Sequence, residues 1–397
     1  MAKKGIPNDK LWAVILAGGK GQRLFPLSNP TKEKQFVCIN PETGSLLQNT
    51  IKRFISIGVK PTNAVIVTTC DRQTRLASDD ALSLGVLSQN IYQIDPDLGY
   101  TGAMDAGTEF ISKIDNSAII INSPSDQLIE KNASFKDSMQ TAIEYANKGS
   151  FVNVGVRITD LVTYMGTGHM QYDKEGRITK FIEKPDRELA DKLMREGNTA
   201  CNTGINVWRA DRFLEAVKGE NLKGMPTDKF IQILMKKDLR AVVGSFPWYD
   251  CGTLNSLYEV GMAMGKGSPD HHNVTYGNVK KGGTQGTYCL ESYIRADSGH
   301  RIEAYNIPKA AVIATFINGK PAFVACAKSE SQRMREVAEE FERTGTLKVG
   351  PETEVLLTDA SVECAIAVIG LPGAKVVVTK GKTPGVKYDW LITMPHC

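Results

Sequence analysis

The sequence predicts an α/β protein in which a mixed, mostly parallel sheet is followed by a β-rich region. In the first part of the chain, short apolar runs alternate with stretches of helical periodicity. This alternation is typical of strand-helix-strand units, which build a sheet with helices on both faces. After about Gly265, short apolar runs punctuated by Gly, Asn and Pro replace the helical pattern, which indicates an all-β unit. We therefore expect an α/β domain at residues 1–265 and a β-rich domain at residues 266–397.

The expected strands and helices of the first part alternate along the chain. Leu11 to Leu16 is a continuous apolar run, and Ala64 to Thr69 is rich in β-branched residues. Further elements follow the same two periodicities. We expect strands at 11–16, 64–69, 91–95 and 117–121, and helices at 45–57, 74–84 and 101–114.

The β-rich region contains two similar stretches, at 305–315 and 367–379. Each consists of an apolar strand, a turn containing proline and a second apolar strand. Such repetition predicts a β-helix-like unit of stacked strands. Between the two stretches, residues 331–341 form a charged amphipathic pattern, which we interpret as a helix on the solvated surface.

Length and composition indicate a globular protein with more than one domain. At 397 residues the chain exceeds one ordinary core. Hydrophobic residues make up 42% of it, enough to offset the entropy that folding costs. The net charge of +4 is spread along the chain, which suits small anionic ligands and does not indicate nucleic acid.

Nothing in the sequence indicates a membrane segment or a disulfide framework. Residues 1–10 are polar and unlike a signal peptide. No apolar run approaches the roughly 20 residues of a membrane helix. The eight cysteines include no C-x-x-C pair, so we interpret them as reduced thiols. These features predict a cytoplasmic protein that binds neither membrane nor nucleic acid.

Two turns fall at the carboxyl ends of expected strands, where ligands of such sheets bind. The first is a glycine-rich loop, Leu16-Ala17-Gly18-Gly19-Lys20-Gly21-Gln22-Arg23, and the second ends at Asp126. Glycines let backbone N–H groups approach an anion, and an arginine can add a charge-assisted bond to a phosphate. The spacing fits neither a dinucleotide loop nor a P-loop. Taken alone, the glycines are also compatible with an ordinary turn.

Five further motifs follow the glycine loop in a fixed order. They are Lys34-Gln35-Phe36, Asp126, Phe181-Ile182-Glu183-Lys184-Pro185, Asn202-Thr203-Gly204 and Trp248-Tyr249-Asp250-Cys251-Gly252-Thr253. With these motifs the sequence resembles the sugar-nucleotide pyrophosphorylases, and among them the mannose-1-phosphate guanylyltransferases. The resemblance extends from about Leu11 to Val260 and continues more loosely beyond.

The resemblance implies a fold and a reaction. The fold is a Rossmann-like nucleotidyltransferase domain of the GT-A type, followed by an assembly or regulatory β-rich domain. The reaction joins a sugar 1-phosphate to a nucleoside triphosphate, with GTP favoured, and releases a GDP-mannose-like product and pyrophosphate. Mg²⁺ is the implied cofactor, and a homo-oligomer, a dimer, is expected.

The resemblance also implies the residues that bind the nucleotide and the metal. Asp126 and Asp250 match the positions that hold Mg²⁺, a hard cation that prefers carboxylate oxygens. Arg23 and Lys34 match residues that clamp the triphosphate and neutralise charge on the departing pyrophosphate. Asp95 is kept as a reader of guanine, because a carboxylate can accept from both N1–H and the 2-amino group. The backbone of the glycine loop completes the nucleotide site through Leu16, Ala17, Gly18, Gly19 and Gly21.

The remaining matches imply a site for the sugar 1-phosphate. Lys184 matches the lysine that grips its phosphate, and Gly168, Glu183 and Asn202 match positions that hold sugar hydroxyls. No histidine is required as a base, because the phosphate dianion is already a nucleophile that only has to be aligned.

The sequence departs from the family pattern at four places, so the identities of the nucleotide and the sugar stay open. Glu33 replaces a proline, Gly99-Tyr100 replaces an Arg-Asn pair, Gln127 replaces a histidine, and Met165-Gly166 replaces Tyr-Gly. One alternative is the same chemistry with another nucleoside triphosphate, or with glucose or heptose 1-phosphate. Another is a non-catalytic sensor of a nucleotide-sugar, although such a module would be expected to lose Asp126, Asp250 or Lys184.

Overall fold

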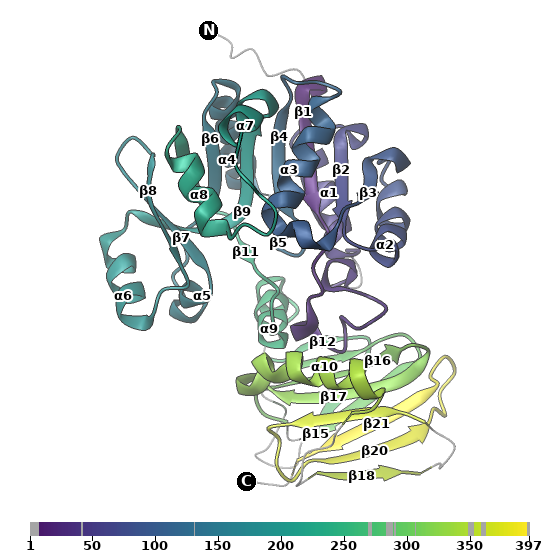
Figure 1. The fold of residues 1–397 in the computed structure, drawn as a ribbon. Coiled ribbons are helices and arrows are strands. Elements are labelled where there is room, and N and C mark those ends of the chain that lie inside the picture. The colour runs from purple at the N-terminus through teal and green to yellow at the C-terminus, as the bar shows by residue number, and fades with distance from the viewer. Residues whose placement is uncertain are drawn as a thin grey trace. The chain divides into compact units, whose positions relative to one another are not determined.

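The chain forms two compact units in a computed structural model (Figure 1). The first unit comprises residues 1–18 and 46–248, and the second comprises residues 19–45 and 249–397. The structure describes residues 8–40, 43–130, 132–268, 272–282, 289, 291–305, 307–347, 353–358 and 363–394.

The first unit is built on one mixed sheet, as the sequence predicts. Its strand order is β10-β6-β9-β4-β1-β2-β3, with β7 pairing with β8 and β9 beside this path. Strands β1 to β4 run parallel, β10 is parallel to β6, and β9 is antiparallel to both of its neighbours. The bounds are β1 (Leu11–Leu16), β2 (Ala64–Thr68), β3 (Ile91–Gln93), β4 (Ile119–Pro124), β5 (Leu128–Ile129), β6 (Phe151–Val156), β7 (Gly168–Tyr172), β8 (Ile178–Glu183), β9 (Thr199–Arg209), β10 (Leu239–Gly244) and β11 (Trp248–Tyr249).

Helices cover both faces of this sheet. Side chains alternate along β1, so Trp12, Val14 and Leu16 join one core cluster, to which α3, α7 and α8 also contribute. Helix α4 contacts β6, β9 and β10 but contributes no residue to that cluster, as expected of a helix on the opposite face. The bounds are α1 (Leu46–Ile55), α2 (Asp71–Leu82), α3 (Gly99–Ser112), α4 (Ala133–Asn147), α5 (Leu161–Met165), α6 (Arg187–Glu196), α7 (Ala210–Ala216) and α8 (Thr227–Met235).

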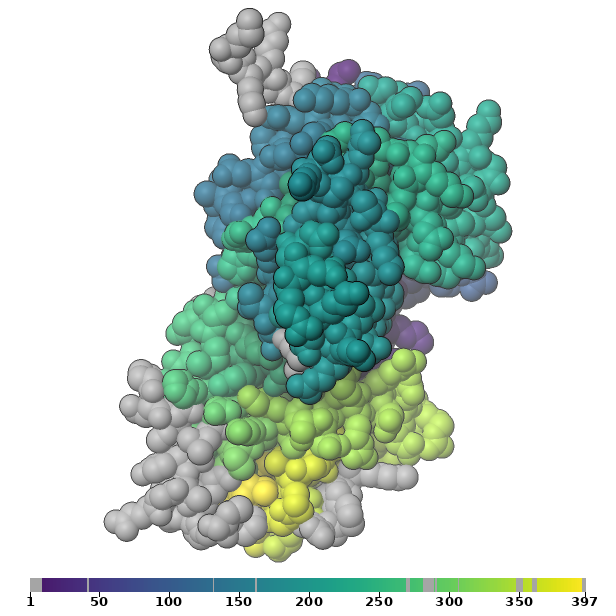
Figure 2. All heavy atoms as spheres, turned by 90° about the vertical axis from the view of Figure 1, so that its left-hand side faces the viewer, coloured from purple at the N-terminus to yellow at the C-terminus, as the bar shows by residue number. Residues whose placement is uncertain are grey.

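A small lobe formed by β7, β8, α5 and α6 extends from the main sheet. It has its own core, which includes Tyr164, Ile182, Ala190 and Leu193. In the space-filling view its teal residues cover the middle of the face that is turned to the viewer (Figure 2). The lobe carries three of the candidate sugar-site residues, Gly168, Glu183 and Lys184.

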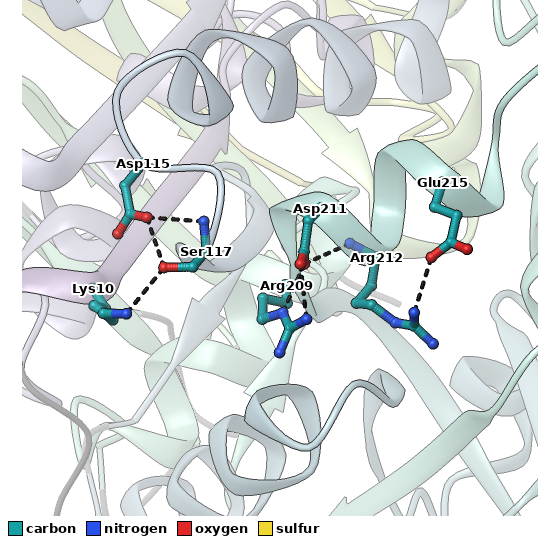
Figure 3. Close-up of polar contacts among 7 residues, drawn as sticks. All are labelled: Lys10, Asp115, Ser117, Arg209, Asp211, Arg212 and Glu215. Atoms are coloured by element: carbon teal, nitrogen blue, oxygen red, sulfur yellow. Dashed lines mark hydrogen bonds and ion pairs between the residues drawn. The ribbon is translucent and has the colours of Figure 1, made fainter.

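Polar contacts occupy the edge of the sheet where β1 and β4 begin (Figure 3). Lys10 Nζ donates to Ser117 Oγ at 3.0 Å, and Asp115 Oδ1 accepts from both the amide and the hydroxyl of Ser117 at 2.8 Å. Nearby, the Arg209 guanidinium donates to both carboxylate oxygens of Asp211, at 2.6 and 2.7 Å. These side chains therefore bond to one another at the edge opposite the carboxyl ends of β1 and β4.

The second unit consists of two stacked five-stranded sheets, which confirms the predicted β-helix-like region. The strand orders are β12-β14-β16-β17-β19 and β13-β15-β21-β20-β18, and most neighbours run parallel. Residues of both sheets share one apolar core, which includes Ile294, Ile302, Phe323 and Trp390. The bounds are β12 (Val274–Tyr276), β13 (Asn278–Gly282), β14 (Tyr293–Ala296), β15 (His300–Tyr305), β16 (Ala310–Ile317), β17 (Lys320–Ala327), β18 (Glu354–Leu357), β19 (Ala365–Ile369), β20 (Lys375–Lys380) and β21 (Tyr388–Thr393).

The two similar stretches of the sequence both lie where the chain changes sheets, in opposite directions. The first passes from β15 to β16, and the second passes from β19 to β20, so each crosses from one sheet to the other. Asn306, in the first of these turns, lies outside the described residues. The helices of the unit are α9 (Leu254–Ala263) and α10 (Met334–Thr344).

Residues 19–45 belong to the second unit although they follow the first strand of the first unit. The buried Arg295 guanidinium helps to hold this segment in the second unit, because Nη1 donates to the carbonyls of Cys38 and Ile39 at 2.7 and 3.3 Å. The compact units therefore divide at Trp248–Tyr249, and not at the change in composition near residue 265. A catalytic role for residues 1–265 and an assembly or regulatory role for residues 266–397 stay predictions. Among the described residues, no helix has both the length and the apolar character needed to cross a membrane.

We predict that Asp105→Asn stabilises the protein at about pH 8 but not at about pH 4. Burial, together with the charge of Glu109, raises the pKa of Asp105 from 3.8 to about 6. The folded state therefore binds the proton more tightly than the unfolded state, and stability falls as the pH rises through this window. The thermal midpoint of the variant should exceed that of the wild type by about 2–4 °C at the higher pH. An equal increase in the thermal midpoint at both pH values would show that the raised pKa of Asp105 is not the cause.

Candidate active site

The carboxyl ends of β1 and β4 meet at one edge of the first unit. The Ser125 amide and hydroxyl both donate to the carbonyl of Leu16, at 3.1 and 2.6 Å, and the Ala17 amide donates to the carbonyl of Val67 at 2.8 Å. The structure thus brings the start of the glycine loop and the turn that carries Asp126 together.

Gly18 is required by a close approach at the same edge. Its carbonyl accepts from Thr69 Oγ1 and Gln73 Nε2, both at 3.2 Å. A Cβ atom at this position would lie 2.6 Å from Thr69 Cγ2, which is closer than real Cβ contacts allow. Glycine therefore lets the loop leave β1 while it stays bonded to the end of β2.

A polar pocket of about 430 Å³ lies in the first unit at this edge. Two carboxylates, two amides, a phenol and a threonine hydroxyl line it, and this mixture of donors and acceptors suits a small ligand with several hydroxyl groups. The lining residues are Tyr100, Pro124, Gln127, Gly168, Glu183, Asn202, Gly204, Pro226, Thr227 and Asp228. Three sugar-binding candidates, Gly168, Glu183 and Asn202, thus share one cavity.

The hairpin of β7 and β8 places Gly168 directly opposite Glu183. A Cβ atom on Gly168 would lie 2.6 Å from Glu183 Oε2 and 2.8 Å from the Phe181 ring, so glycine leaves room for that carboxylate in the pocket. Lys184 follows with a positive φ of 44°, and its amide donates to the carbonyl of Thr167 at 3.1 Å. Its Nζ lies 3.8 Å from Glu183 Oε1, and 66% of its side chain is exposed. The ammonium group therefore lies beside the pocket and is accessible to an anion.

An irregularity in β9 positions Asn202. The register between β6 and β9 shifts from Val154–Ile205 to Gly155–Asn202, which leaves residues 203 and 204 unpaired in the ladder. Asn202 Oδ1 accepts from the Gly204 amide at 2.8 Å, and Gly204 has a positive φ of 74°. Such bulges commonly re-aim a side chain at a functional site, and this one directs Asn202 to the pocket.

Tyr100 and Gln127, two of the departures from the family pattern, both line the pocket. The Tyr100 hydroxyl donates to the carbonyl of Gly204 at 3.2 Å. Burial and the negative charge of Asp126 raise the pKa of Tyr100, so this phenol stays protonated. Gln127 Oε1 accepts from Trp248 Nε1 at 3.0 Å, which leaves Gln127 Nε2 as the group that can donate to a ligand.

Asp95, the expected reader of guanine, is not among the residues that line this pocket. One carboxylate oxygen accepts from the Asp97 amide at 2.9 Å and caps the short turn at 96–98. The other lies 3.7 Å from Lys223 Nζ, with 57% of the side chain exposed. A role in base recognition stays a prediction, and it would require a ligand to compete with these local partners.

The second unit brings Arg23, Lys34 and Asp250 together. The buried Lys34 ammonium donates to the main-chain carbonyl of Asp250 at 2.7 Å. A Cβ atom on Gly252 would lie 2.2 Å from Asp250 Oδ2 and 3.5 Å from Arg23 Nη2. Both side chains therefore approach the Gly252 backbone, and the Asp250 carboxylate occupies the space that a Cβ atom would take.

The candidate residues are thus divided between the two units. Leu16, Ala17, Gly18, Asp95, Asp126 and the sugar-site residues belong to the first, whereas Gly19, Gly21, Arg23, Lys34 and Asp250 belong to the second. Within the parts of the chain that the structure describes, no three His, Cys, Asp or Glu side chains form a group that could hold a metal ion.

Three of the pocket residues belong to none of the motifs that the sequence contains. Pro226 precedes α8, and Thr227 and Asp228 form its first turn. Proline followed by an acidic residue marks the start of a helix, but that pattern alone does not distinguish a helix end in a pocket from one at the surface.

A family profile described as Nucleotidyl transferase matches residues 12–267. The chain belongs to this family. The match confirms the resemblance, and it places the glycine loop, the pocket and Asp250 inside the family region of a nucleotidyl transferase.

Relatives and a solved structure agree with this assignment. The nucleotidyl transferase is 26% identical to the mannose-1-phosphate guanylyltransferase RfbM of Salmonella typhimurium, across 83% of this chain and 72% of that protein. It is 25% identical to a mannose-1-phosphate guanylyltransferase of Escherichia coli, across 86% and 75% of the two chains. Its fold matches that of a mannose-1-phosphate geranyltransferase from Thermus thermophilus with a TM-score of 0.66 and 23% identity, across 84% of this chain and 99% of that one.

We predict that Gly21→Ala lowers turnover by about ten-fold or more, because it displaces Lys34. Gly21 has a positive φ of 63°, and a Cβ atom there would lie 2.1 Å from Lys34 Cβ. The left-handed backbone alone costs roughly 1–2 kcal/mol for alanine, and the clash adds to it. Steady-state kinetics and thermal unfolding check the two effects.

Gly319→Ala is the matched control for this prediction. Gly319 has a φ of 77° but nothing within 4 Å of its Cβ position. This variant should therefore lose only the roughly 1–2 kcal/mol of backbone strain, less than Gly21→Ala, with turnover close to that of the wild type. Equal kinetics for the two variants would show that strain, and not the displacement of Lys34, causes the loss.

Proposed function

We propose that this nucleotidyl transferase is a sugar-1-phosphate guanylyltransferase that makes GDP-mannose and pyrophosphate from GTP and mannose 1-phosphate. The polar pocket lined by Gly168, Glu183 and Asn202 carries the proposal. It offers carboxylate and amide partners for sugar hydroxyls at the edge of the sheet where ligands of such folds bind. The match to mannose-1-phosphate guanylyltransferases over more than four fifths of the chain supports this choice of substrates.

The sugar phosphate is bound and aligned by Lys184 and its neighbours. Its dianion attacks the α-phosphorus of the nucleotide, and the bond to the β-phosphate bridging oxygen breaks as pyrophosphate leaves. No proton has to be removed from the nucleophile, so positioning provides most of the rate enhancement. The positive φ of Lys184 fixes the main chain directly after Glu183, which sets where the ammonium group meets the phosphate.

Arg23 and Lys34 bind the triphosphate and stabilise the charge that develops on the leaving pyrophosphate. Arg23 is exposed, so its guanidinium can form a bidentate contact with phosphate oxygens. Lys34 is buried and held by the Asp250 carbonyl, so it adds a fixed positive charge and needs little reorganisation during the reaction.

Asp126 and Asp250 are the residues that would hold Mg²⁺. Both follow strands, and both supply the hard oxygen donors that this ion prefers. The negative charge of Asp126 contributes to the raised pKa of Tyr100, which lines the pocket, and this supports a position for the carboxylate near the proposed sugar. Bound Mg²⁺ would neutralise phosphate charge and orient the α-phosphate.

The same proposal includes a homodimer and a cytoplasmic location. Light scattering would measure the oligomeric state.

Pyrophosphate release across a panel of substrates tests the proposal. The common nucleoside triphosphates are each combined with mannose, glucose and heptose 1-phosphates, and we expect the highest kcat/KM with GTP and mannose 1-phosphate. Preference for another pair would keep the reaction and change its substrates. Binding of a nucleotide-sugar without turnover of any pair would favour a sensor.

Lys184→Ala should raise the KM for the sugar 1-phosphate by about ten- to a hundred-fold, because a charge-assisted hydrogen bond contributes roughly 1.5–3 kcal/mol. GTP binding without sugar should stay near that of the wild type in calorimetry. Lys180→Ala removes an exposed lysine from β8, the strand that ends directly before Lys184, and serves as the control. Normal sugar phosphate affinity in the Lys184 variant would remove this residue from the site.

Asp126→Asn and Asp250→Asn should each reduce turnover by about a hundred-fold or more, because metal coordination contributes several kcal/mol. Circular dichroism should show both variants folded, since neither change removes core volume. Asp137→Asn, at an exposed position on α4, should behave like the wild type. Full activity in excess chelator would contradict the metal assignment.

A further inference from the structure

Helix α10 of the second unit has a buried apolar face, and the sequence alone does not reveal what covers it. Met334, Ala338 and Phe341 form an apolar stripe and are 0%, 3% and 8% exposed. The other face carries ion pairs within the helix, such as Arg335–Glu339 at 2.9 Å. The expected solvated face is thus present, but the helix also packs against another part of the unit.

The partner of α10 is the turn η2 (Gln22–Leu24), which carries Arg23. The rings of Phe341 and Phe25 pack with centroids 5.5 Å apart. Gln22 Nε2 donates to Glu342 Oε1 at 3.3 Å, and Arg23 Nη1 donates to Gln332 Oε1 at 3.4 Å. One apolar and two polar contacts therefore fasten the glycine loop to the helix and to the residues just before it.

The main chain of the loop is held locally, since the Ser28 hydroxyl donates to the Gly21 carbonyl at 2.7 Å and Leu24 is buried, but the Arg23 side chain has less support. The turn of the loop has three residues, and its N-cap residue Gly21 adopts a left-handed conformation without a side-chain cap. The Arg23 side chain is exposed, and a long side chain loses roughly 1.5–2 kcal/mol of rotamer freedom when it is fixed. Contacts that restrict Arg23 before the ligand binds lower the entropy that is lost on binding, and they therefore strengthen binding.

We propose that α10 is a positioning element of the triphosphate-binding loop. Phe341 fixes the main chain of η2 through Phe25, and Gln332 restricts the guanidinium of Arg23. The β-rich region then contributes to nucleotide affinity without touching the nucleotide. This inference rests on the proposed function, because it takes Arg23 as a ligand of the triphosphate.

Phe341→Ala in the full-length chain tests the proposal. We expect the KM for GTP to rise by about ten-fold, equivalent to roughly 1.4 kcal/mol, with the KM for the sugar 1-phosphate unchanged. Phe341→Leu keeps an apolar contact and should restore most of the affinity. Calorimetry with inorganic tripolyphosphate gives a second readout that depends on neither the base nor the sugar.

Phe323→Ala is the matched control. Phe323 is buried in the same unit and stacks on Trp390 with centroids 5.0 Å apart, so its loss destabilises the β-rich core without removing a contact to η2. We expect a lower thermal midpoint with unchanged KM values. If Phe341→Ala raises the KM for GTP no more than this control, the positioning role is refuted.

A double-mutant cycle identifies the residue through which α10 acts. Gln332→Ala changes a residue near the surface, so the variant should fold even if Phe341→Ala does not. It should weaken tripolyphosphate binding in the wild type and have almost no further effect in Arg23→Ala. Additive losses would overturn the inference. Absence of triphosphate binding and turnover in the wild type would instead refute the proposed function.

Discussion

The arrangement of Arg23, Lys34 and Asp250 in the second unit depends on one hydrogen bond, which the Lys34 ammonium group donates. This group is buried and donates to the carbonyl of Asp250, across 216 residues of sequence. A buried charge is tolerated only where polar partners satisfy it, so this contact links the segment at 19–45 to the turn that carries Asp250. Glycine is required at position 21 because its φ is positive and its backbone packs against Lys34 Cβ. The Arg295 guanidinium holds a later part of the same segment through the carbonyl of Cys38.

Local periodicity predicted the framework of the first unit well. The apolar run at 11–16 is β1, and the helix expected at 101–114 is α3 at Gly99–Ser112. These segments have strong patterns because each buries a whole strand or one face of a helix. The β-rich region could also be predicted, since the repeated strand, turn and strand mark corners where the chain changes sheets.

Membership of the units could not be predicted, because long-range contacts decide it. Residues 19–45 contain short turns with little periodicity, and their assignment depends on Arg295 and Asp250, far along the chain. The partner of the apolar face of α10 could not be predicted for a similar reason. The stripe of Met334, Ala338 and Phe341 is narrow, and many charges surround it. Ordered motifs identified most candidate residues, but Thr227 and Asp228 enter the pocket only through the position of α8.

The discontinuity of the second unit sets the order in which the protein can fold during synthesis. Residues 19–45 leave the ribosome early, whereas Asp250 follows Lys34 by 216 residues and Arg295 follows Cys38 by 257. At typical elongation rates of about 5–20 residues per second, roughly 10–50 s pass between the synthesis of residues 19–45 and the synthesis of these partners. The strands from β1 to β9 are all synthesised before Asp250, so they can pair before residues 19–45 acquire these partners. The contacts that hold residues 19–45 in the second unit therefore form late, after most of the first sheet has been synthesised.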